Sequence, residues 1–170
     1  MKFDYLPFMR TTPARQVTRP NEAWAIDFAI LDFAQRPSVM LVVDVGTGRP
    51  LSATVSLVVA EDIVVVLDRL VRRSGSPEQV WMDYSISYNT DQGCFHPSLH
   101  DWAKQNRIWL THDLMLQTRR VSERPLRKLE AFLRDKQFPT LIELGREIER
   151  WRQSYTAAPA LHSCSFLPRH

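Results

Sequence analysis

Three carboxylates occupy places where acidic side chains could do chemistry. Asp27 lies inside an apolar, strand-like stretch, and Asp83 ends a short apolar run at residues 79–83. Glu123 opens a helical pattern among basic residues. An ionised carboxylate in apolar surroundings is costly unless it is paired, hydrogen-bonded or bound to a metal. Oxygen ligands without His or Cys suit Mg²⁺ or Mn²⁺, and two such ions can promote phosphoryl transfer.

Each carboxylate also has a structural interpretation, and the residues alone leave both open. Asp27 could cap a turn or pair with an arginine, and Asp83 could simply end a strand. Glu123 could be a helix N-terminal charge, which the helix dipole favours. If the strands that carry Asp27 and Asp83 are neighbours, the two side chains can meet, and Glu123 could complete the cluster from its helix.

A basic run surrounds Glu123. Five positive charges fall within ten residues: Arg119, Arg120, Arg124, Arg127 and Lys128. Such a run can be a solvated helix face. Beside a carboxylate cluster it is also a plausible contact for the DNA backbone, with salt-sensitive binding that tolerates changes of sequence.

The composition is that of one globular domain. The chain has 170 residues, of which 44% are hydrophobic and 24% charged, which excludes a disordered or fibrous chain. Its net charge of +3 hides a division. Residues 1–100 hold 9 Lys and Arg against 11 Asp and Glu, whereas residues 101–170 hold 13 against 8. The front half is therefore acidic and the back half basic.

Other features bear on location. The apolar runs are too short for a membrane span, and no signal peptide is evident. The two cysteines, Cys94 and Cys164, give no disulfide framework. These features predict a cytoplasmic protein with no membrane partner.

The pattern of apolar residues predicts the elements that position the three acids. Three strands at residues 23–33, 38–45 and 51–58 form an antiparallel meander, with a turn at residues 46–50. A helix at residues 61–73, the strand at 79–83, a second helix near residues 99–103 and a strand at 108–110 follow. Helices at residues 122–136 and 140–155 end the order βββαβαβαα. This order predicts an α/β fold with a mixed five-stranded sheet flanked by helices.

Three organisational segments are expected. Residues 1–20 carry Pro7, Pro13 and Pro20 among arginines, which favours an extended basic N-terminal arm. Residues 21–156 form the core, and residues 157–170 form a C-terminal tail.

Several segments, taken as an ordered set, resemble the catalytic core of insertion-sequence transposases and retroviral integrases. The stretch from Arg19-Pro20-Asn21 through Trp24 to Asp27 resembles the segment that delivers the family's first aspartate. Residues 41–49, with Asp44, Thr47 and Arg49, resemble its second strand and the following turn. Residues 77–83 resemble the strand that delivers the second aspartate, and residues 121–132 the helix with the third acid.

The resemblance implies a ribonuclease H-like fold and a DNA strand-nicking and strand-transfer activity. It implies Asp27, Asp83 and Glu123 as catalytic residues and as ligands of Mg²⁺ or Mn²⁺. It also implies DNA as a partner, a homodimer, and a separate DNA-binding transposase subunit, since no such module precedes the core. The alternative is a catalytically inactive integrase-like protein that binds DNA or a transposase partner.

Two departures from the family pattern shape these expectations. Asp91, in Asp91-Gln92-Gly93-Cys94-Phe95, is a rival second acid; Asp83 is preferred because it ends a strand. Pro125 fits best in a first helical turn. It therefore predicts that Glu123 lies just before its helix rather than on the inward face that the family requires.

Overall fold

The fold is built from nine elements in the order βββαβαβαα. The computed structural model describes residues 17–33, 36–55, 60–82, 95–112 and 117–157. Within these ranges the elements are β1 (Ala23–Ile30), β2 (Ser38–Asp44), β3 (Arg49–Val55), α1 (Ala60–Ser74), β4 (Gln79–Met82), α2 (Pro97–Asn106), β5 (Trp109–His112), α3 (Gln117–Leu133) and α4 (Leu141–Ala157). The predicted order is confirmed.

One mixed sheet joins the five strands in the order β3-β2-β1-β4-β5. β1, β2 and β3 pair antiparallel, which confirms the predicted meander. β4 pairs parallel to β1, with Ile26 opposite Met82, and β5 pairs parallel to β4. The strand that carries Asp27 is therefore the central strand, next to β4.

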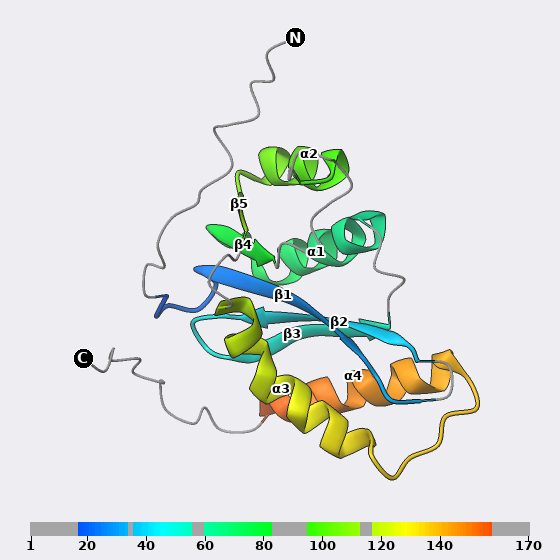
Figure 1. Ribbon diagram of the computed structural model, residues 1–170. Coiled ribbons are helices and arrows are strands. Elements are labelled where there is room, and N and C mark those ends of the chain that lie inside the picture. The colour runs from blue at the N-terminus through cyan, green and yellow to red at the C-terminus, as the bar shows by residue number, and fades with distance from the viewer. Residues whose placement is uncertain (1–16, 34–35, 56–59, 83–94, 113–116, 158–170) are drawn as a thin grey trace.

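Helices cover both faces of this sheet (Figure 1). On one face, α1 and α2 bury a core that contains Trp24, Ile26 and Leu67. On the other face, α3 and α4 bury a second core that contains Leu41 and Leu129. The nearly continuous apolar run of β2 follows from this arrangement, because both of its faces are covered. The architecture is a three-layer α/β/α fold of the ribonuclease H-like type.

The largest departure from expectation is at α3. The prediction that Glu123 lies just before the helix is wrong, because α3 begins at Gln117 and contains Pro125. Proline in a helix interior removes one hydrogen bond and costs roughly 3 kcal/mol. Pro125 is buried on the side of α3 that faces the sheet. Its burial there offsets part of the cost, which explains why the helix continues through it.

Candidate active site and basic helix face

Asp27 faces the α3 side of the sheet. Side chains alternate between the two faces along a strand. Trp24 and Ile26 belong to the core under α1 and α2. Asp27 therefore points to the opposite face together with Ala23 and Ala25, and there α3 packs against β1. The two alanine side chains are small, which lets α3 approach β1. Asp27 therefore contacts α3 rather than an apolar core.

The α3 side chain that contacts Asp27 is Ser122. Its hydroxyl donates a hydrogen bond to Oδ2 of Asp27, and the serine is fully buried. The other carboxylate oxygen, Oδ1, accepts the backbone N–H of Phe28 at 2.8 Å. Both oxygens of Asp27 thus have protein donors.

Glu123 lies on another side of the same helix. Successive residues of an α-helix point about 100° apart. The Glu123 side chain is 60% exposed, and its Oε1 lies 3.5 Å from a guanidinium nitrogen of Arg127, one turn along α3. The structure therefore brings Asp27 together with Ser122 and leaves Glu123 on the solvent side of the helix.

The other predicted acids cannot be placed. Asp83 and its rival Asp91 lie outside the described residues. Within the described ranges, no three His, Cys, Asp or Glu side chains gather as they would have to in order to hold a metal ion. The described groups that contact the Asp27 carboxylate are the Ser122 hydroxyl and the Phe28 backbone N–H, and both donate hydrogen bonds to it. Among the described residues, these contacts of Asp27 therefore supply no second carboxylate for the two-ion site that the resemblance implies.

The predicted basic run forms an exposed helix face. We call the exposed side chains of Arg120, Arg124, Arg127 and Lys128 the α3 basic face. Arg119 lies in α3, but its side chain is outside the described residues. The spacing of these four residues places them on one side of the helix, opposite the buried Ser122, Pro125 and Leu129. Arg127 is partly neutralised by Glu123.

An aromatic residue of α4 borders the α3 basic face. Nζ of Lys128 lies 4.9 Å from the centroid of the Tyr155 ring, within cation–π range. Burial raises the pKa of the Tyr155 phenol, although the nearby positive charge of Arg124 acts in the opposite direction. The phenol is therefore neutral at physiological pH, and it places an aromatic ring beside the α3 basic face.

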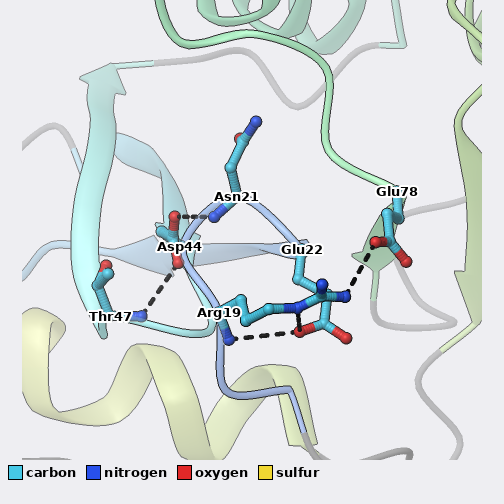
Figure 2. A network of polar contacts seen from close by, with 6 residues as sticks. All are labelled: Arg19, Asn21, Glu22, Asp44, Thr47 and Glu78. Atoms are coloured by element: carbon cyan, nitrogen blue, oxygen red, sulfur yellow. Dashed lines mark hydrogen bonds and ion pairs between the residues drawn. The ribbon is translucent and has the colours of Figure 1, made fainter.

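A polar network fixes the start of β1 against the turn between β2 and β3 (Figure 2). Oδ2 of Asp44 accepts the backbone N–H of Asn21 at 2.7 Å, and Oδ1 accepts that of Thr47 at 3.0 Å. Asn21 adopts a left-handed conformation with φ 61°, which asparagine tolerates better than most residues. Its side-chain oxygen accepts the indole N–H of Trp24 at 2.8 Å. The residues that support the resemblance at Asn21, Trp24 and Asp44 thus serve to anchor the strand.

Glu22 and Arg19 form a second set of contacts at the start of β1, and these extend to Glu78 before β4. Its Oε2 accepts the backbone N–H of Arg19 at 3.3 Å, and the Arg19 guanidinium reaches Glu78 at 3.4 Å (Figure 2). Burial by itself would raise the pKa of the Glu22 carboxyl. Hydrogen bonds from the backbone of Arg19 and Thr18 outweigh burial and hold that pKa below its ordinary value. Glu22 is therefore a buried anion held by its neighbours.

The sequence analysis missed Ser122 and the anchoring role of Asp44. A signal for Ser122 was present: it stands seven residues before Leu129 and eleven before Leu133, so it falls on the apolar stripe of α3. Glu123 does not. For Asp44 the signal was a carboxylate at the end of an apolar strand, two residues before the Gly46-Thr47-Gly48 turn.

The comparisons with known proteins agree with the fold. Neither a family model nor a curated protein sequence matches this chain. Among solved structures, the catalytic core domain of BIV integrase matches with a TM-score of 0.61 and 16% identity, over 79% of this chain and 82% of that one.

Two further integrase structures give the same result. The simian T-cell lymphotropic virus intasome, solved with PP2A regulatory subunit B56 gamma, matches with a TM-score of 0.67 and 16% identity, over 91% of this chain and 55% of that one. The HTLV-2 integrase catalytic core domain, in complex with magnesium in a trimeric form, matches with a TM-score of 0.59 and 14% identity, over 82% and 87%. This chain therefore has the fold of retroviral integrase catalytic cores. Among its described residues, no helix is long and apolar enough to span a membrane.

Proposed function

We propose that this chain is an integrase-like core that binds DNA through the α3 basic face without efficiently cutting or joining it. The observation on which the proposal rests is that Ser122, and not Glu123, faces Asp27 from α3. A carboxylate that helps to hold a catalytic metal ion must reach the same ion as its partners. Glu123 instead pairs with Arg127 on the exposed side of the helix.

The α3 basic face supports the DNA-binding part of the proposal. Its four cations share one exposed side of a single helix. Arg and Lys in this arrangement neutralise phosphates and release counterions, whichever base sequence is present. The neighbouring Tyr155 adds an aromatic surface beside Arg124 and Lys128.

A titration of duplex DNA at several salt concentrations tests this part. Each phosphate contact contributes about 0.9 to the slope of log affinity against log salt. We expect the double substitution Arg124→Gln and Lys128→Gln to weaken binding and to reduce the slope by about 2. Arg69→Gln is the control for the loss of one positive charge outside the α3 basic face, because Arg69 is exposed on α1, which covers the other face of the sheet. Its effect is compared with half the effect of the double variant. A loss in the control as large as that half would contradict the proposed interface.

A second candidate is the strand-transfer activity itself. In this candidate Asp27, Asp83 and Glu123 would hold Mg²⁺ or Mn²⁺. The parallel register of β1 and β4 favours it, because Ile26 pairs with Met82 and each is followed in sequence by an aspartate. Nicking of plasmid DNA that is lost on Asp27→Asn, Asp83→Asn and Glu123→Gln alike would support this second candidate over the first.

The proposal also concerns the protein partners of this chain. The matched integrases are described as an intasome and as a trimeric form, which supports self-association of this chain as well. We propose a homodimer, with a separate DNA-binding transposase subunit as a further partner. Sedimentation velocity of the chain alone tests the homodimer, and a monomer throughout the micromolar range would contradict it.

A further inference from the structure

We infer that the Ser122 hydroxyl holds Asp27 in the place of a divalent cation, so that a single carboxylate at position 122 converts this site into a Mn²⁺ site. The inference deepens the proposed function and rests on its premise that the native site lacks a carboxylate from α3. It concerns a residue that the resemblance does not single out. Ser122 is a positioning residue, because its hydroxyl orients the Asp27 carboxylate.

The geometry identifies position 122 as the point where α3 meets the acid. Ser122 is fully buried, and its hydroxyl contacts Oδ2 of Asp27. It shares the buried stripe of α3 with Leu129 and Leu133. Leu126, one turn further along, is apolar and packs against the same core. Among the described side chains of α3, only the one at 122 makes a polar contact with Asp27.

The chemistry of the contact explains why Asp27 and Ser122 by themselves make a poor cation site. A hydrogen bond from Ser122 uses a lone pair on Oδ2, and the Phe28 N–H uses one on Oδ1. Mg²⁺ and Mn²⁺ favour carboxylate ligands, and the neutral Ser122 hydroxyl adds no negative charge to that of Asp27. A carboxylate at 122 would reverse this situation. It would place two negative charges side by side, and a divalent cation between them removes the repulsion.

Calorimetric titration with MnCl₂ tests the inference. We expect Ser122→Asp and Ser122→Glu to bind Mn²⁺ at least ten times more tightly than the native protein. Adding Asp27→Asn to either variant should abolish the gain, because the second ligand is lost. Glu130→Gln is the matched control on an exposed position of the same helix, and it should leave the Mn²⁺ affinity of the native protein and of the Ser122 variants unchanged.

Two results would overturn the inference. One is a folded Ser122→Asp or Ser122→Glu protein whose Mn²⁺ affinity equals that of the native protein. The other is tight Mn²⁺ binding by the native protein that Glu123→Gln removes. Circular dichroism and the thermal unfolding midpoint of each variant establish that it is folded before it is titrated.

A second measurement keeps the inference testable if the buried position rejects a carboxylate. Ser122→Ala and Asp27→Asn each remove one partner of the same hydrogen bond. If the pair is coupled, the double variant lowers the urea midpoint by less than the sum of the single losses. Additive losses would show that the two side chains act independently, and this would overturn the inference.

The outcome is separable from the test of the proposed function. The Mn²⁺ titration uses no DNA, and the α3 basic face points away from Ser122. If the basic-face variants bind DNA normally while Ser122→Asp gains Mn²⁺, the DNA-binding proposal fails and the inference stands. The reverse pattern would reject the inference and leave the DNA-binding proposal in place.

Discussion

At the scale of single residues, Asp44 joins two segments of the fold. Its carboxylate accepts two backbone N–H groups from segments that are far apart in sequence, at Asn21 and Thr47. It is also one of the few charged side chains that are buried in the described parts of the chain. Asp44 therefore holds the entry to β1 against the turn that follows β2.

Replacing Asp44 with alanine should destabilise the protein strongly. A hydrogen bond to a charged group contributes about 1.5 to 3 kcal/mol, and an N–H left without its partner adds a penalty. We expect the free energy of unfolding to fall by about 2 to 4 kcal/mol, measured by urea denaturation. Asp32→Ala is the control, because Asp32 is exposed just after β1; its effect should stay within about 0.5 kcal/mol. A similar effect for both variants would contradict the role given to Asp44.

The lowered pKa of Glu22 predicts a pH dependence of stability. The folded state holds this carboxyl below its ordinary pKa of 4.5, so folding favours the ionised form. The stabilisation is complete above that ordinary value and is lost as the pH falls through the lower folded pKa. Glu22→Gln should therefore lose less unfolding free energy than the native protein between about pH 6 and pH 3. Denaturant titrations across this range measure the difference, and parallel pH profiles would argue against it.

At the scale of elements, the phase of α3 decides what the site contains. Glu123 is an exposed anion, whereas Ser122, one residue earlier in α3, is a buried hydroxyl in contact with Asp27. The order of the elements along the chain was predictable, because each strand has its own run of apolar residues and a clear turn follows β2. The start of α3 was not, because the backbone preference of Pro125 points to a later start, and only tertiary packing overrides it.

The contact of Asp44 with Asn21, which anchors β1, could not be predicted from the sequence. Asn21 and Asp44 lie 23 positions apart, and nothing in either local pattern indicates that a backbone N–H and a carboxylate meet. From the sequence, the neighbourhood of β1 and β4 could be stated only as a condition: Asp27 and Asp83 can meet if the two strands are adjacent. The pairing itself is confirmed, while the meeting of the two acids remains a prediction.

The contact between the segment before β1 and the turn after β2 gives a test at the element scale. A Cβ atom at Gly46 would lie 2.0 Å from the backbone oxygen of Arg19, so a side chain there pushes the two segments apart. Gly46→Ala should lower the free energy of unfolding by about 1 to 3 kcal/mol, as overpacking does.

Gly145→Ala is the matched control for Gly46→Ala. Gly145 lies in α4, where an added Cβ meets no atom within 4 Å. Alanine is the better helix former there, so this control should raise the free energy of unfolding by about 0.5 to 1 kcal/mol. Thermal or urea denaturation of both variants measures the contrast. Destabilisation of equal size in the two would contradict the close contact at Gly46.

At the scale of the whole molecule, the basic half of the sequence includes the helices on one face of the sheet. The basic half, with 13 Lys and Arg against 8 Asp and Glu, contains α3 and α4, which cover one face of the sheet (Figure 1). The candidate acid Asp27 points to that same face. The α3 basic face and the contact between Asp27 and Ser122 therefore lie on the same side of the sheet.

A plasmid assay tests the proposal of DNA binding without efficient cleavage most directly, because one reaction reports both binding and cleavage. Supercoiled plasmid is incubated with the protein and Mn²⁺, and each sample is run on a gel before and after protein removal. The account predicts retarded DNA before protein removal and intact supercoiled DNA afterwards. Open-circular or linear DNA that disappears with Asp27→Asn and Glu123→Gln, or a complete lack of retardation, would contradict it.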